Sequence, residues 1–285
     1  MSEAPAMAEE FDPLETEATR SLLDQLVADS RLYTNGKDYK DLLDFVVRLR
    51  NFAPFNAMLL QVQKPGLSYA APARDWEESF GRRPKEGARP LLILWPFAPV
   101  ALVYDVLDTE GRELPKDVNP FQAKGNVEAS HITQFIHLMG GKNIHCDLVD
   151  AGDAAAGRIR LVKRPTDATE KARYKMLVNR NHLAPVQLST IAHELGHLFL
   201  GHLGPDKHLA VPTRASMNVG QMELEAESVA YLVCCRHGVK PNSDKYLSSY
   251  VKATTSVDII DTYQVMRAAG QVETVLELAE RSNPR

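Results

Sequence analysis

The stretch Ile191–His202 (IAHELGHLFLGH) places three histidines and one glutamate in an otherwise apolar run. His193 and His197 are four residues apart, so on a helix both side chains lie on one face, one turn apart. Glu194 directly follows the first histidine and completes the pattern H-E-x-x-H. In that pattern the two imidazoles bind Zn²⁺ and the glutamate accepts a proton from the attacking water. The stretch therefore predicts a helix that carries a zinc site able to do chemistry.

A catalytic zinc site usually has three protein ligands and one open position for water. The extended pattern H-E-x-x-H-x-x-G-x-x-H would supply the third ligand, but Leu200 and Leu203 stand where it requires glycine and histidine. His202 lies one residue before the position at which this pattern requires its third histidine. We expect it to be structural or to face solvent, with a hydrogen bond to a metal ligand as the alternative. The third ligand must come from another segment.

An acidic helix further along the chain, residues 221–233 (QMELEAESVAYLV), offers that ligand. Helical periodicity places Glu223 and Glu225 on opposite flanks of its apolar stripe and does not choose between them. Glu223 and Glu227 share a flank one turn apart. We therefore predict Glu223 as the ligand and Glu227 as the acceptor of a hydrogen bond from a ligating histidine. Glu225 is the alternative ligand, although a solvated charged face would also explain it.

The composition indicates an ordinary globular protein. Of 285 residues, 44% are hydrophobic, 25% are charged and 7% are aromatic, which excludes a fibrous or largely disordered chain. The length fits one large domain or two smaller ones, and we expect two. A formal net charge of -4 provides no overall attraction for nucleic acid or an anionic membrane, so such binding requires a local patch.

The sequence favours a cytoplasmic protein that does not enter membranes. Its acidic N-terminus lacks the pattern of a secretory signal. The longest uncharged run, residues 90–104, is shorter than a membrane span and is broken by Pro96 and Pro99, so it predicts two buried strands and a turn. Cys146, Cys234 and Cys235 are expected to be free thiols in a reducing compartment.

Two domains of α+β architecture are expected. A linker rich in proline, asparagine and glycine, residues 114–126, marks the boundary. Residues 1–13 are expected to form a flexible tail, residues 14–118 a helix-rich α+β domain, and residues 125–285 a domain with a small sheet and the helix of the zinc site. Periodicity and turn residues predict helices at 14–33, 39–52, 55–62, 72–81, 127–139, 185–201 and 219–236 and two more beyond, a loop at 82–90, and strands at 91–95, 100–107, 144–149, 158–162 and 174–178.

The second half of the chain resembles the gluzincin-like ImmA/IrrE metallopeptidases, which are linked to cleavage or release of transcriptional repressors. In that family the first acid of an E-x-E-A-x-x-x-A segment is the metal ligand, which supports Glu223. A polar residue, often asparagine, follows four positions later, and Glu227 departs from that pattern. The resemblance covers about residues 125–240 and implies a zincin-like metallopeptidase domain. It rests on the stretch at 191–202 and on Glu223, Glu225, Ala226 and Ala230.

A set of residues spread over the first half keeps a characteristic order in the chain: Asn56, Leu59, Leu60, Pro65, Trp76, Gly81, Lys85, Glu86, Gly87, Pro96, Tyr104, Asp105, Val106 and Thr109. In these residues the first half resembles the ArdC-type domain of plasmid antirestriction proteins, which is associated with binding of single-stranded DNA. Members of that family join this domain to a C-terminal H-E-x-x-H domain, so the two resemblances support each other.

A basic cluster in the first half is the candidate surface for single-stranded DNA. Such binding needs cations for the phosphates and aromatic faces for the bases. Acidic residues interleave the cluster, and residues 1–120 hold 14 Lys and Arg but 20 Asp and Glu. A solvated loop, with Trp76 and Phe80 in the core, is the alternative interpretation. The candidate DNA-binding residues are Arg74, Trp76, Arg82, Arg83, Lys85 and Arg89.

These patterns lead to one main hypothesis and two alternatives. The main hypothesis is a zinc-dependent metallopeptidase that hydrolyses peptide bonds in a protein target, such as a transcriptional repressor, and is coupled to single-stranded DNA binding by the first half. Glu194 would act as general base and then as proton donor. The strand at 174–178 is expected to present an edge to the substrate peptide, and Tyr174, His182 and His208 are candidate oxyanion stabilisers. The alternatives are an antirestriction-type DNA-binding protein with a structural metal and a regulatory module that does not cleave.

Overall fold

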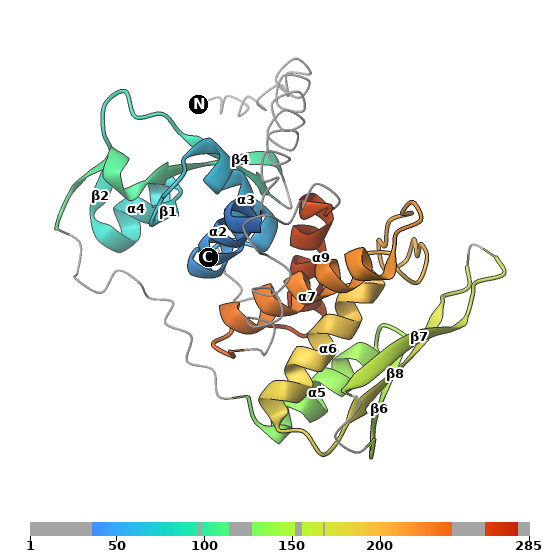
Figure 1. Ribbon diagram of the computed structural model, residues 1–285. Coiled ribbons are helices and arrows are strands. Elements are labelled where there is room, and N and C mark those ends of the chain that lie inside the picture. The colour runs from blue at the N-terminus through green and yellow to red at the C-terminus, as the bar shows by residue number, and fades with distance from the viewer. Residues whose placement is uncertain are drawn as a thin grey trace, which may run out of the picture.

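The computed structural model describes residues 36–95, 98–113, 127–151, 156–167, 169–240 and 260–278. The predicted tail, the predicted helix at 14–33, the linker and one of the two C-terminal helices lie outside these residues. The predicted α+β class is confirmed, because helices and small separate sheets alternate along the chain (Figure 1). None of the helices in the described part combines the length and hydropathy that crossing a membrane requires.

The first half, residues 36–113, is built from three helices and two small antiparallel sheets. One sheet has the strand order β1-β4-β3, and the other pairs β2 with β5. The prediction of a loop at residues 82–90 is wrong for its first three residues. These residues form strand β2, because residues 109–111 form a strand that pairs with them. The elements are α2 (Gly36–Arg48), α3 (Pro54–Gln63), β1 (Ala70–Ala71), α4 (Ala73–Phe80), β2 (Arg82–Pro84), β3 (Leu91–Trp95), β4 (Ala98–Asp105), a 3₁₀ turn η2 (Val106–Asp108) and β5 (Thr109–Gly111).

Helix α3 covers the free edge of strand β3 with two amide side chains. Asn56 accepts from the backbone N–H of Leu94 at 2.9 Å and donates to its carbonyl at 3.0 Å. Gln63 makes the same pair of bonds with Leu92, both at 2.8 Å. The two amides are seven residues apart, two helical turns, so they face the same way. These bonds occupy backbone N–H and carbonyl groups that an edge strand would otherwise leave without a partner.

The second half, residues 127–278, places a three-stranded mixed sheet against helices α5 and α6. The strand order is β6-β8-β7, with β6 parallel and β7 antiparallel to β8. The predicted substrate edge at 174–178 is therefore wrong: β8 is the central strand, and the free edge next to α6 belongs to β7. The elements are α5 (Ala129–Gly140), β6 (Ile144–Val149), β7 (Gly157–Lys163), β8 (Arg173–Asn179), α6 (Ala184–Phe199), α7 (Val219–Arg236) and α9 (Thr262–Val275).

The two halves share one core. Buried apolar side chains of α2 and α3 form a continuous cluster with those of α6, α7 and α9. Arg236, at the end of α7, ties this contact together: its guanidinium donates to the carbonyls of Val46 at 2.8 Å and Phe52 at 2.9 Å, and to Glu273 on α9 at 2.6 Å. Tyr231 adds a 2.6 Å hydrogen bond to Asp44 on α2. Helix α7 is thus held at one end by the first half of the chain.

Candidate metal centre

Helices α6 and α7 approach closely at the H-E-x-x-H motif because small residues meet there. A Cβ on Gly196 would lie 3.3 Å from both the Cα and the carbonyl oxygen of Ala226. Gly196 lies between the two histidines of the motif, and Ala226 lies one turn after Glu223. The close packing of these backbones therefore brings a carboxylate from α7 up to two imidazoles on α6.

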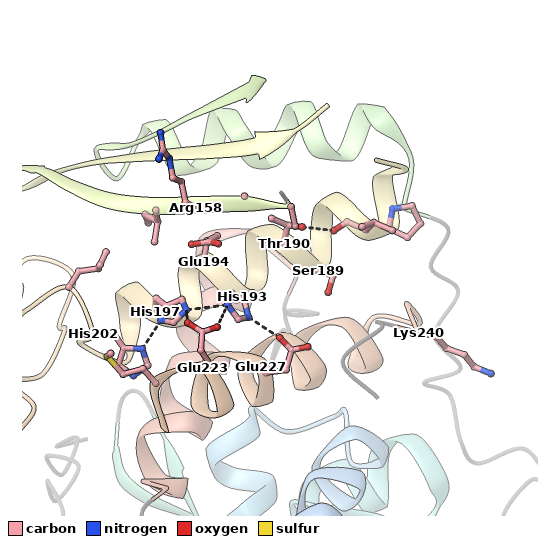
Figure 2. A pocket seen from close by; sticks show the side chains of 17 residues that line it. Arg158, Ser189, Thr190, His193, Glu194, His197, His202, Glu223, Glu227 and Lys240 are labelled. Atoms are coloured by element: carbon pink, nitrogen blue, oxygen red, sulfur yellow. Dashed lines mark hydrogen bonds and ion pairs between the residues drawn. The ribbon is translucent and has the colours of Figure 1, made fainter. Parts of the chain in front are cut away.

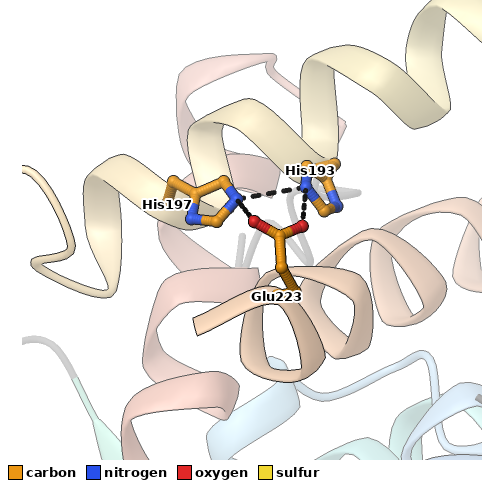
Figure 3. A group of neighbouring side chains, drawn as sticks. All are labelled: His193, His197 and Glu223. Carbon is orange, nitrogen blue, oxygen red and sulfur yellow. Dashed lines mark hydrogen bonds and ion pairs between the residues drawn. The ribbon is translucent and has the colours of Figure 1, made fainter. Parts of the chain in front are cut away.

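His193, His197 and Glu223 converge on one point (Figure 3). The two Nε2 atoms are 3.1 Å apart, and the Glu223 oxygens lie 3.4 Å from Nε2 of His193 and 3.5 Å from Nε2 of His197. Two ligands bound at about 2.0 to 2.1 Å to a tetrahedral ion are themselves about 3.3 to 3.4 Å apart. Each of these approaches is close to the separation of two ligands on a tetrahedral ion, with a different Glu223 oxygen next to each histidine, and one donor atom from each residue lies within 4.8 Å of the others. Their N, N, O chemistry suits a divalent transition metal.

His193 is oriented by Glu227. Its Nδ1 lies 2.9 Å from a Glu227 oxygen, so Nδ1–H donates to the carboxylate and the Nε2 lone pair faces Glu223. Burial lowers the pKa of His193, but the bond to Glu227 and the charges of Glu227, Glu194 and Glu223 outweigh it, and the pKa is raised. Glu227 occupies the place expected for the partner of a ligating histidine.

His197 is oriented by a chain of hydrogen bonds that the sequence did not reveal. Its Nδ1 lies 2.8 Å from Nδ1 of His202, and Nε2 of His202 lies 3.2 Å from Glu225. The tautomer of His202 that donates from Nε2 to the ionised Glu225 accepts at Nδ1, so His197 donates from its own Nδ1 and keeps its Nε2 lone pair for a metal. Burial and the neighbouring His193 and His202 lower the pKa of His197 to about 3, so this ring is neutral.

Glu225 is buried, which corrects the expectation of a solvated charge and argues against it as the metal ligand. Its side chain is 0% exposed and is compensated by Arg214 at 2.9 Å, the backbone N–H of Asp261 at 3.0 Å and His202. Burial raises the pKa of Glu225, but the bonds from His202, Asp261 and Arg214 together lower it, so the carboxylate stays ionised. His202, with a side chain 2% exposed, does not face solvent as one alternative predicted.

Glu194 lies on the side of α6 that faces strand β7 (Figure 2). Burial raises its pKa, while the charge of His193 and a hydrogen bond from the backbone N–H of Ile159 oppose that effect. A carboxylate with a raised pKa is a better proton acceptor, as general-base catalysis requires. Glu194, the three converging side chains and Glu227 line one cavity of about 700 Å³, whose wall includes Gly157, Arg158 and Ile159 of the β7 edge.

The candidate oxyanion stabilisers predicted from the sequence do not line this cavity. Tyr174 is buried and its hydroxyl donates to Asp206 at 2.9 Å. His208 lines a different cavity, between α3 and α9, and His182 is absent from the cavity wall. The prediction fails because it chose polar residues by type, whereas tertiary structure decides which of them reach the site.

The predicted DNA-binding cluster of the first half is divided between core and surface. Trp76 is 0% exposed and its indole N–H donates to the carbonyl of Tyr104 at 2.9 Å, so it cannot stack on a base in this structure. Arg82 donates to Thr109 and to the carbonyl of Arg112. The remaining cations lie at the surface: Arg74 pairs with Glu78, Arg83 with Glu110, Lys85 donates to the carbonyl of Leu107, and Arg89 is exposed.

Comparison with family models agrees with the resemblance found in the second half of the sequence. Residues 153–234, which include all three converging side chains, match the model of a peptidase family described as the IrrE N-terminal-like domain. The metal-free crystal structure of the antirestriction ArdC protein from the R388 plasmid is similar to 79% of this chain and 84% of its own, with 16% identity and a TM-score of 0.36. Its Mn(II)-bound structure covers 96% of this chain and 100% of its own, with 17% identity and a TM-score of 0.40. No curated protein matches.

Proposed function

We propose that this chain, with an IrrE N-terminal-like domain at residues 153–234, is a zinc-dependent peptidase that hydrolyses peptide bonds in a protein target. The convergence of His193, His197 and Glu223, with one donor atom from each within 4.8 Å of the others, carries this proposal. The site has three protein donors, which is the number found in catalytic rather than structural zinc sites.

In the proposed reaction the bound zinc supplies Lewis-acid activation of the water and of the scissile carbonyl. Glu194 takes the proton that the attacking water loses and delivers it to the leaving amine. The N–H of Ile159 fixes the Glu194 carboxylate beside β7. Glu227 and His202 keep the two histidines in the tautomer that leaves each Nε2 free to bind.

The substrate is proposed to bind as an extended peptide along the free edge of β7. That strand is outermost in the order β6-β8-β7, and its residues Gly157 to Ile159 line the cavity beside Glu194. Backbone groups of an unpaired strand edge bind an added strand independently of its sequence, and pockets then select the side chains. This arrangement favours a protein segment over a small molecule as substrate.

The target and the setting of the reaction are further parts of the proposal. By resemblance to the ImmA/IrrE peptidases, the substrate is a transcriptional repressor. The three cysteines are free thiols, which suits a reducing cytoplasm. Coupling to single-stranded DNA through the first half would rest on the exposed cations Arg74, Arg83, Lys85 and Arg89.

A pair of isosteric substitutions separates metal binding from proton transfer. Glu194→Gln should retain the metal measured by elemental analysis but lose cleavage of a peptide library prepared from a cell lysate, because only the proton acceptor is removed. Glu223→Gln should lose both, because it removes a metal donor. Full cleavage by Glu194→Gln would refute the mechanism.

The alternatives give different results in the same experiment. A structural metal in a protein that does not cleave predicts stoichiometric Zn²⁺ or Mn²⁺ in the wild type without any cleaved peptide. Comparing the proteomes of cells that express wild type and Glu194→Gln extends the test to the natural target. Fragments that appear with wild type alone would identify the substrate and its cleavage site.

A further inference from the structure

The sheet β6-β8-β7 has one apolar and one charged face. Residues paired across neighbouring strands point to the same side of a sheet. Cys146, Met176 and Ile159 form one such row, and this side packs against helices α5 and α6 (Figure 1). The adjacent row has the opposite orientation and consists of His145, Lys175 and Arg160.

Cations dominate the second face. Arg158 follows the same orientation on β7, two residues and about 7 Å from Arg160, and its side chain points away from the histidines of α6 (Figure 2). Arg173 of β8 lies opposite Lys163 of β7 in the strand register. Residues 142–180 hold nine Lys and Arg against five Asp and Glu, in a chain whose formal net charge is -4. The segment that forms this sheet therefore has a local excess of positive charge in a chain that is negative overall.

Three of these arginines are available to bind a partner. Lys163 is paired with Glu170 and Lys175 with Asp147. Arg158, Arg160 and Arg173 are exposed, and no carboxylate of the described residues pairs with them. A guanidinium binds phosphate through two parallel N–H donors, which makes arginine the preferred residue for phosphate recognition.

We propose that this face, defined by Arg158, Arg160, Arg173, Lys163, Lys175 and His145, binds the phosphate backbone of nucleic acid. The surface is an open sheet rather than a pocket, and it presents cations spaced along two strands. No Phe, Tyr or Trp side chain lies among the outward residues of its described strands. Binding without aromatic stacking is electrostatic, independent of base sequence and strongly dependent on salt.

The same features disfavour an acidic protein as the partner. The centres of protein interfaces are depleted in charge and contain buried aromatic or aliphatic anchors. On this face the exposed apolar side chain is Val162, at the far end of β7, and Leu177 is only partly exposed. A polymer of phosphates needs no such anchor, because release of its counterions supplies the free energy of binding.

The test compares two triple variants that each remove three exposed positive charges. Arg158→Gln/Arg160→Gln/Arg173→Gln alters the sheet face, and Arg74→Gln/Arg83→Gln/Lys85→Gln alters the cluster that the sequence predicted. Binding of a fluorescein-labelled single-stranded oligonucleotide is followed by anisotropy at several salt concentrations, and circular dichroism checks the fold of both variants. Each lost phosphate contact lowers the slope of log K against log salt by about 0.7, so the sheet variant should lose about 2 from its slope.

The expected result separates the contributions of the two surfaces. Between about 50 and 200 mM salt, the wild type should lose about 20-fold more affinity than the sheet variant does, and the first-half variant measures the contribution of Arg74, Arg83 and Lys85 separately. An unchanged slope in the sheet variant, or no binding to the wild type at the lowest salt, would overturn the proposal. Stronger binding of labelled poly-glutamate than of the oligonucleotide would overturn it in favour of an acidic protein.

Discussion

Replacing His202 by alanine tests whether this residue orients a metal ligand. In the structure His202 accepts a hydrogen bond from Nδ1 of His197 and donates one to Glu225. Without it, His197 can rotate or adopt the tautomer that carries a proton on Nε2, and that tautomer cannot bind a metal. The substitution leaves His193, His197 and Glu223 in place, so every expected effect on the metal acts through orientation.

The expected loss follows from the geometry of one hydrogen bond to one ligand. Removing the partner of a metal-bound histidine typically costs 10- to 100-fold in metal affinity, which is about 1.4 to 2.7 kcal/mol of binding free energy. The His202 side chain is 2% exposed, so bulk water does not readily replace its 2.8 Å contact with His197. His202→Asn should recover part of the loss, because an amide oxygen can accept from Nδ1 of His197 as the imidazole nitrogen does.

Zinc affinity is measured by competition with a chromophoric chelator, and stability by urea unfolding of the metal-free protein. His237→Ala is the matched control, because His237 also lies 3.2 Å from a buried glutamate, Glu273, but far from the donors along α7. The control should lose stability and keep its zinc affinity. Equal zinc affinities in wild type, His202→Ala and His237→Ala would show that His202 has no orienting role.

Two further predictions concern stability. Gly157→Ala places a methyl group 2.6 Å from Cγ2 of Thr190 and 2.7 Å from the carbonyl oxygen of Leu177. This overpacking between β7 and α6 should lower the free energy of unfolding in urea by about 1 to 3 kcal/mol. Gly140→Ala is the control and should not destabilise the protein, because its new methyl group has no atom within 4 Å. A destabilised Gly140→Ala with an unaffected Gly157→Ala would contradict the packing. Glu273→Gln breaks the buried pair with Arg236 and should cost about 3 kcal/mol at neutral pH. Burial raises the pKa of Glu273, but His237 and Arg236 outweigh this effect and lower the pKa below 4.5. The stability that Glu273 contributes is therefore fully present above pH 4.5 and is lost as the pH falls through the lowered pKa. A difference between wild type and variant that grows toward low pH would refute this assignment.

The centre of the site was predictable because its information is local. His193 and His197 are four positions apart in the sequence, and so are Glu223 and Glu227, so helical geometry alone placed each pair on one face. The structure then brings the first of those acids to the histidines and the second to Nδ1 of His193. The bounds of α7, Val219–Arg236, also follow from capping and periodicity.

What could not be predicted depends on contacts between distant segments. Glu225 looked like a solvated acid because its compensation comes from Arg214, His202 and the backbone of Asp261, all outside its own helix. The central position of β8 depends on strand order, which alternating hydrophobicity does not encode. The basic character of the sheet face required the register, since only pairing shows that Arg160 and Lys175 share a side.

Helix α7 is one continuous helix with different contacts at its two ends. Glu223 near its start faces the histidines, and Arg236 at its end is fixed by carbonyls of the segment around α2 and α3. These two residues are 13 positions apart, about 20 Å along the axis. A shift of α2 would therefore be transmitted along one continuous helix to Glu223 at its other end. The contact between the two halves and the candidate metal centre are thus mechanically coupled.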